Sequence, residues 1–184
     1  MTNPKRPREL SRLEQALLGL TSKGGPCSAY WLRRQFQQSP SSFFSGSAGA
    51  VYPAVERLEK RGLIDSQTLK EGRRISRRYS VTEEGEQALR KWLLPPLPTE
   101  DVAFTMDPVR TRVYYLDALS PSERARFVED ALVQARRRAA VIKAESDGLR
   151  ESEDRFSFLG GLGALYEARA RVRWLEELRR SLNR

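Results

Sequence analysis

The hydrophobic pattern changes its period at Gly62, and this change constrains the fold more than any other feature. Over residues 10–20, leucines recur at intervals of three and four, which is typical of a helix with one buried face. Over residues 63–81, β-favouring residues flank a turn-like, basic KEGRR segment, which predicts a hairpin. The chain therefore begins with helices and then turns to a small two-stranded sheet.

Three more helices surround this hairpin in the sequence. One is predicted over about residues 28–38, between the helix-breaking SKGGP and SPSSFFSGS segments. The next begins at Ser47, whose hydroxyl can cap the first turn, and ends at Gly62, which can adopt a left-handed conformation. Thr82 is predicted to cap the last, which ends at Pro95. Three helices, a hairpin and a closing helix in this order are typical of a winged helix-turn-helix, whose third helix enters the DNA major groove.

Two helix-breaking residues interrupt this third helix. Pro53 removes the amide that would bond to the carbonyl of Gly49. A buried stripe through Val51 and Val55 turns both residues outward together with Tyr52. This outward surface would let the backbone approach DNA, with Tyr52 at its centre. The side chains expected to be buried are Leu32, Phe36, Val51, Val55, Leu58, Leu89, Trp92 and Leu93.

The whole chain has a net charge of +9. Most of this positive charge lies in the first half of the chain. Residues 1–96 hold 17 basic against 9 acidic residues, while residues 97–184 hold 16 against 15. A basic half joined to a nearly neutral half indicates a polyanion-binding module on a separate scaffold. Four arginines crowd the hairpin, but Arg77 and Arg78 face opposite sides of a strand, so at most one of the two points at DNA.

The predicted DNA-binding residues lie on the two helices and on the wing. They are Ser28, Tyr30, Ser47, Ala48, Gly49, Tyr52, Pro53, Arg57, Arg73, Arg74 and Arg77. Arg57 follows Pro53 by one turn and could reach the DNA backbone or a base edge. The alternative for Tyr52 is an ordinary amphipathic surface ring. The remaining charged residues of the third helix are interpreted as solvated surface: Glu56, Glu59, Lys60 and Arg61.

Two heptad-like seams run through the second half of the chain. Their predicted dimerisation residues are Val128, Leu132, Ala135, Ala139, Ile142, Leu165, Val172 and Leu175. We favour packing between two chains, because so narrow a seam on an extended arm builds no globular core alone. The alternative is a helical hairpin within one chain. We therefore expect a mainly α protein with a winged helix carrying a two-stranded wing (1–94), a connector (95–106) and a helical dimerisation domain (107–184).

Several classes of function lack the residues that they need. The sequence has no histidine, which removes the commonest general base and metal ligand, and one cysteine, Cys27, which is expected to be a buried thiol. We therefore expect no enzyme, no metal and no cofactor. No apolar run is long enough to span a membrane, and no apolar core follows the basic N-terminus. The expected location is the cytoplasm.

The first half of the chain resembles the PadR family of bacterial winged-helix transcriptional regulators. The segments that carry the resemblance are LEQALLGL, GPCSAYWL, GAVYPAVERLEKRGLI and RRYSVTEEGEQALRKWL, with Ala29 in place of the usual glycine. The resemblance covers residues 10–94, and the Tyr-Pro pair of the third helix is its most specific part. The second half is similar in general terms to the long helical arm of the branch that includes virulence-gene activators. The resemblance implies a homodimer held by its C-terminal helices that binds operator DNA and often represses a gene.

We accordingly expect a sequence-specific repressor that binds double-stranded DNA as a homodimer. The operator would be an inverted repeat with half-site centres about one helical turn apart. The resemblance also implies, for some members, release by small aromatic or cationic compounds at the dimer interface. A pocket for a small aromatic ligand is kept as a hypothesis on the residues Trp92, Phe104, Met106, Tyr114, Tyr115, Phe156, Phe158 and Trp174. The alternative function is a winged-helix protein-interaction module without operator-specific binding.

Overall fold

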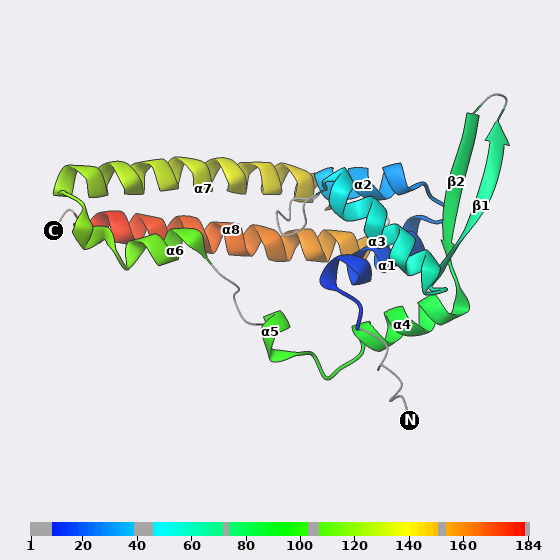
Figure 1. Ribbon diagram of the computed structural model, residues 1–184. Coiled ribbons are helices and arrows are strands. Elements are labelled where there is room, and N and C mark those ends of the chain that lie inside the picture. The colour runs from blue at the N-terminus through cyan, green and yellow to red at the C-terminus, as the bar shows by residue number, and fades with distance from the viewer. Residues whose placement is uncertain (1–8, 39–45, 72–73, 103–106, 151–153, 183–184) are drawn as a thin grey trace. The chain divides into compact units, whose positions relative to one another are not determined.

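The computed structural model describes residues 9–38, 46–71, 74–102, 107–150 and 154–182, without the side chains of residues 70–75 (Figure 1). The chain divides between Leu97 and Pro98 into two compact units. Among the described residues, no helix combines the length and the apolar character that a membrane crossing requires.

The N-terminal unit has the predicted winged-helix order. Its elements are α1 (Arg12–Gly24), α2 (Ala29–Gln38), α3 (Ala48–Lys60), β1 (Ile64–Glu71), β2 (Arg74–Val81) and α4 (Glu83–Leu93). The two strands form an antiparallel hairpin that extends from the helices as a wing (Figure 1). The mainly α fold with a two-stranded wing is therefore confirmed.

Helices α1, α2 and α3 enclose the core of this unit. Its most deeply buried side chains are Leu17, Leu18, Leu32, Val51, Val55, Leu58 and Ile64, each no more than 1% exposed. The buried stripe predicted for α3 is confirmed, because its apolar residues recur at helical spacing. Burying each of these large apolar side chains contributes about 1.5–3 kcal/mol, which fixes the position of α3 in the unit.

The register of the wing decides which side chains face the helices. Ser66 pairs with Tyr79, and Thr68 pairs with Arg77. Because successive side chains alternate, Arg77 lies on the same face as the buried Tyr79, and Arg78 lies on the other. The backbone of Tyr79 also exchanges two hydrogen bonds with Cys27, at 2.7 and 3.0 Å. Cys27 is buried, as predicted.

A tight turn joins α3 and the wing to α4. Gly62 has a φ of 71°, which favours glycine, and the Thr82 hydroxyl donates to its carbonyl at 2.6 Å. The Thr82 hydroxyl also accepts from the amide of Gly85 at 3.1 Å, so the predicted cap of α4 is confirmed. The expected burial of Trp92 and Leu93 is wrong, because these side chains are 39% and 61% exposed.

The described residues of the C-terminal unit form two short and two long helices and a 3-10 turn. Its elements are α5 (Thr99–Val102), α6 (Pro108–Val113), η1 (Leu116–Ala118), α7 (Pro121–Arg150) and α8 (Arg155–Leu182). Helices α7 and α8 run antiparallel and pack side by side (Figure 1). Asp107 caps α6 through two amide hydrogen bonds of 3.1 Å and pairs with Arg171 of α8 at 2.6 Å.

The two heptad-like seams face each other inside this hairpin. Val128, Leu132 and Leu175 form its core and are at most 1% exposed, while Ile142 and Leu165 are also buried. The seams thus find a partner within one chain, which is the alternative that the sequence left open. The argument that a narrow seam needs a second chain is therefore wrong, because the seam of α8 packs on that of α7 within one chain. Contact of the eight predicted dimerisation residues with a second chain remains a prediction.

Candidate nucleic-acid interface

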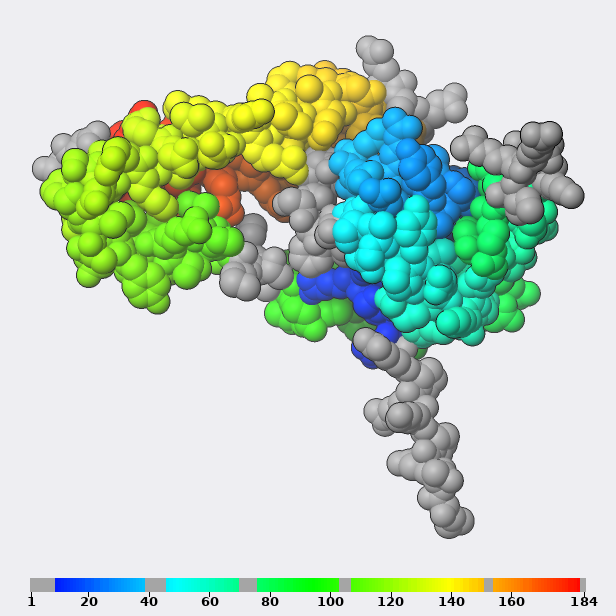
Figure 2. All heavy atoms as spheres, turned by 45° about the horizontal axis from the view of Figure 1, so that its top comes forward, coloured from blue at the N-terminus to red at the C-terminus, as the bar shows by residue number. Residues whose placement is uncertain are grey.

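The N-terminal half of α3 presents a continuous exposed surface. Ala48, Gly49 and Pro53 are exposed, and Tyr52 is half-buried beside them. A Cβ atom built on Gly49 would have no other atom within 4 Å, so the backbone there is open to an approaching group. The atoms of α3 lie at the surface beside those of α2 in Figure 2. This is the surface that the sequence predicts to face DNA.

The first turn of α3 is held from outside the helix. Ser47 occupies the cap position with an extended backbone, and its carbonyl accepts from the amides of Ala50 and Val51 at 3.2 and 3.1 Å. The expected capping bond from its hydroxyl is absent, so this part of the prediction is wrong. Gly46, which precedes Ser47, accepts at its carbonyl from Nε of Arg33 at 3.2 Å.

Pro53 lies inside α3 without ending it. The helix continues from Ala48 to Lys60, and Pro53 faces outward. Because proline has no amide, the carbonyl of Gly49 loses its helical donor in the part of α3 that is most open. The surface therefore offers backbone groups to a partner as well as side chains.

The predicted residues of α2 have different roles. The Ser28 hydroxyl accepts from the amide of Trp31 at 3.1 Å and so caps α2. Tyr30 points outward with 59% of its surface exposed, on the helix that packs against α3. Of these two residues, Tyr30 has its side chain available to an external partner, whereas Ser28 serves to start the helix.

Arg57 is tied to a buried carboxylate of α1. Its Nε donates to Glu14 Oε1 at 2.7 Å, while Glu14 also accepts from the amide and hydroxyl of Ser11 at 2.8 and 2.9 Å. Burial raises the pKa of Glu14, but the hydrogen bonds from Arg57 and Ser11 outweigh it and hold the pKa below its ordinary value. Sequence reasoning missed Glu14, although Ser11 and Glu14 stand at capping-box spacing.

Arg77 is tied to the C-terminal half of α3. Its Nη2 donates to Glu59 Oε1 at 2.6 Å and to the Ser66 hydroxyl at 2.7 Å, and Ser66 donates to the same carboxylate oxygen at 2.6 Å. The guanidinium carbon also lies 5.5 Å from the centroid of the Tyr79 ring. We call Glu59, Ser66 and Arg77 the wing clamp, because they join α3, β1 and β2.

The wing clamp changes two interpretations drawn from the sequence. Glu59 is not ordinary solvated surface, since its side chain is only 25% exposed and accepts two hydrogen bonds. Arg77 has an intramolecular partner, and its contact with DNA remains a prediction. Arg73 lies outside the described residues, and the side chain of Arg74 is likewise not described.

Residues 17–91 match the family model described as "Transcriptional regulator PadR-like family". A curated relative, the negative transcriptional regulator PadR of Bacillus subtilis (strain 168), is 26% identical over 175 residues. The match covers 90% of this chain and 94% of the relative.

Solved structures of similar fold cover nearly the whole chain. Bacillus subtilis PadR in complex with operator DNA has a TM-score of 0.81 and 25% identity, and the match covers 94% of this chain and 99% of that chain. The same protein with p-coumaric acid has a TM-score of 0.77 and 24% identity, with the same coverage. The Vibrio cholerae virulence activator AphA shares the fold at a TM-score of 0.71 and 18% identity, over 93% of this chain and 98% of its own.

Proposed function

The chain carries a PadR-like regulator domain over residues 17–91, and from this premise we propose that the protein represses transcription by binding operator DNA as a homodimer. The observation that carries the proposal is the open surface of α3 around Gly49, Tyr52 and Pro53, on the helix that enters the major groove in winged-helix proteins. The operator complex of Bacillus subtilis PadR, which has a similar fold over 94% of this chain, supports it.

Two kinds of contact follow from this surface. The open backbone at Gly49 and the first amides of α3 suit a phosphate oxygen, which would fix the register of the helix on DNA. Tyr52 and the exposed Tyr30 can contact sugars or thymine methyl groups with their rings and phosphates with their hydroxyls. Because phosphate neutralisation releases counterions, affinity is expected to fall steeply as salt rises.

The second copy requires a face that the hairpin does not already bury. Helix α8 has an outer stripe of apolar and small residues at intervals of three and four, on the side opposite its seam: Phe156, Leu159, Gly163, Tyr166 and Ala170. Phe156 is 79% exposed and Leu159 is 45% exposed, while Gly163 leaves open space above the helix. The outer stripe is therefore the proposed dimer surface, which would pair two winged helices on an inverted repeat.

Release by a small aromatic effector completes the proposal, on the precedent of the Bacillus subtilis PadR structure that contains p-coumaric acid. Among the aromatic residues considered for such a pocket, Tyr114, Tyr115 and Phe156 are exposed, while Trp174 packs on the core of the α7–α8 hairpin. Phe104 and Met106 lie outside the described residues. Addition of p-coumarate to a protein–operator complex, with release followed by fluorescence anisotropy, tests this step.

The DNA-binding proposal is tested by selecting bound fragments from a random DNA pool with the purified protein. The expected product is an inverted repeat whose half-site centres lie about 10 base pairs apart. Tyr52→Ala, which removes the ring from the proposed surface, is selected in parallel and is expected to enrich the same repeat more weakly. Enrichment of no common sequence by the folded dimer would contradict operator-specific binding and favour a protein-interaction module.

A further inference from the structure

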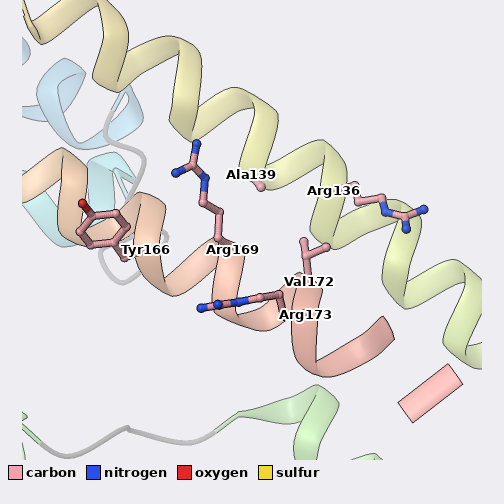
Figure 3. A pocket seen from close by; sticks show the side chains of 6 residues that line it. All are labelled: Arg136, Ala139, Tyr166, Arg169, Val172 and Arg173. Carbon is pink, nitrogen blue, oxygen red and sulfur yellow. The ribbon is translucent and has the colours of Figure 1, made fainter. Parts of the chain in front are cut away.

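A groove on the flank of the α7–α8 hairpin is left unused by DNA binding. Its volume is about 620 Å³, and α7 contributes Arg136 and Ala139 to its lining. Helix α8 contributes the other lining side chains, which are Tyr166, Arg169, Val172 and Arg173. In Figure 3, Arg169 extends from α8 toward α7, and Ala139 and Val172 lie between the two helices. The groove thus combines an apolar floor, an aromatic ring and three guanidinium groups.

Two of these guanidinium groups form no close ion pair with a carboxylate of the described residues. Some other arginines of the C-terminal unit are paired, such as Arg171 with Asp107, Arg136 with Glu176 and Arg179 with Glu129, at N–O distances of 2.6, 2.7 and 3.3 Å. Among the described residues, neither Arg169 nor Arg173 forms an ion pair within 4 Å, and Arg169 interacts with the exposed Asp147 of α7 only through a longer-range attraction that lowers the pKa of that carboxyl group. The groove therefore holds two guanidinium groups that are available to an anionic ligand.

The spacing of the two unpaired arginines is unfavourable for the helix itself. Arg169 and Arg173 stand four residues apart on α8, where like charges are neighbours and destabilise a helix. An anion bound between them would remove this repulsion, and a planar guanidinium matches a carboxylate or phosphate group with two parallel hydrogen bonds. Residues 97–184 are nearly neutral, with 16 basic against 15 acidic residues, so the groove is a local site rather than part of a polyanion surface.

We propose that this groove binds a small organic dianion, either a phosphate monoester or a dicarboxylate, that carries a flat apolar body. The two unpaired guanidinium groups match two negative charges, while the Tyr166 ring and the floor formed by Ala139 and Val172 contact the apolar body. Arg136 is neutralised by Glu176 and contributes the rim. Tyr166 also belongs to the outer stripe of α8, so a bound dianion would touch the proposed dimer surface.

Isothermal titration calorimetry on the full chain, without DNA, tests the site independently of operator binding. The probes are 1-naphthyl phosphate and 2,6-naphthalenedicarboxylate, with 1-naphthol and inorganic phosphate as controls for the apolar body and for charge alone. At least one dianion is expected to bind at least tenfold more tightly than either control. The dianion that binds more tightly shows whether the groove prefers a phosphate monoester or a dicarboxylate. Absence of binding by both dianions, or equal binding of 1-naphthol, would overturn the proposal.

Variants assign the binding to the groove. The double variant Arg169→Ala, Arg173→Ala is expected to weaken binding of the dianion at least tenfold. Arg137→Ala, which removes an exposed charge of α7 outside the groove, should leave the affinity unchanged. Arg173→Lys keeps the charge but loses the two-pronged geometry, and a loss of at least threefold is expected. Circular dichroism and sedimentation confirm fold and dimer. Unchanged binding in the double variant, or an equal loss in Arg137→Ala, would place the ligand elsewhere and overturn the site.

Discussion

Glu59 and Arg77 join the recognition helix to the wing, with Glu59 Oε1 2.6 Å from Arg77 Nη2. Ser66 bonds to both side chains, and α3 cannot turn relative to the two strands without breaking the two hydrogen bonds that Glu59 accepts from Ser66 and Arg77. A winged helix contacts DNA through both parts, and a fixed angle between them sets how both meet the duplex. The wing clamp is therefore expected to affect specificity more than stability.

Glu59→Gln should lower the ratio of operator to non-specific affinity about three- to tenfold, because the wing loses its fixed angle. The free energy of unfolding should fall by no more than about 1 kcal/mol, since Arg77 is half-exposed and such pairs contribute little. Titration of operator and scrambled DNA, with thermal melts, measures both quantities. Glu56→Gln is the control, since Glu56 is an exposed acid of the same helix outside the clamp. If Glu56→Gln lowered the ratio of operator to non-specific affinity as much as Glu59→Gln, the effect would come from the lost negative charge and not from the wing clamp.

Glu14→Gln should lower the free energy of unfolding at pH 7 by about 1–2 kcal/mol, because it loses part of a capping box and a half-exposed ion pair to Arg57. The pKa of Glu14 is lowered in the folded protein, so its contribution is present above the unfolded pKa of about 4.5 and is lost as pH falls through the folded value. The wild-type chain should therefore lose its advantage over the variant below about pH 4.5. Urea titrations from pH 7 to pH 3 measure this difference, and a pH-independent gap would contradict the assignment.

Gly49→Ala should separate DNA binding from folding. No atom obstructs a Cβ at this position, and alanine favours a helix over glycine by up to about 1 kcal/mol, so the variant should be as stable as the wild type or more so. If the backbone of Gly49 approaches a phosphate, the methyl group should weaken operator binding about tenfold, as expected for one lost contact. Gly148→Ala is the matched control, because a Cβ there is equally unobstructed on α7. Unchanged operator affinity in Gly49→Ala would show that the backbone of Gly49 does not contact DNA.

Local features of this fold could be predicted from the sequence, whereas side-chain pairs distant in sequence could not. The buried stripe of α3 follows from its spacing, and the roles of Gly62 and Thr82 follow from backbone preference and capping. The partner of Arg57 lies 43 residues away, so it depends on how α1 packs on α3. The seams of α7 and α8 define two faces that pack equally well within or between chains, and periodicity cannot distinguish these cases.

Tyr52→Ala should weaken operator binding by about 1–2 kcal/mol, because the ring loses its contact with a sugar, base or phosphate. Its dimer should stay intact, since Tyr52 lies in the N-terminal unit and the proposed dimer surface lies on α8. Tyr114→Ala is the control, as Tyr114 is 76% exposed and lies in the C-terminal unit. Fluorescence anisotropy and sedimentation report the two properties separately. Wild-type operator affinity in a folded Tyr52→Ala dimer would exclude this ring from the recognition surface.

Leu159→Glu should dissociate the dimer without unfolding the hairpin. Leu159 is 45% exposed in the single chain, so a charge there costs little until a second copy covers it, when an unpaired carboxylate is buried. Val133→Glu is the control, because Val133 is 58% exposed on α7, outside the stripe. Leu132→Ala instead tests the intrachain seam, and it should lower the free energy of unfolding by about 2–5 kcal/mol because Leu132 is fully buried.

Sedimentation equilibrium distinguishes these three variants. We expect Leu159→Glu to be a monomer, Val133→Glu to be a dimer and Leu132→Ala to be a dimer with a lower free energy of unfolding. Dissociation by Val133→Glu alone would move the dimer surface from α8 to the outer face of α7. Loss of operator affinity should accompany only the variant that dissociates, because one winged helix contacts one half-site and the second half-site contributes only when two copies are joined.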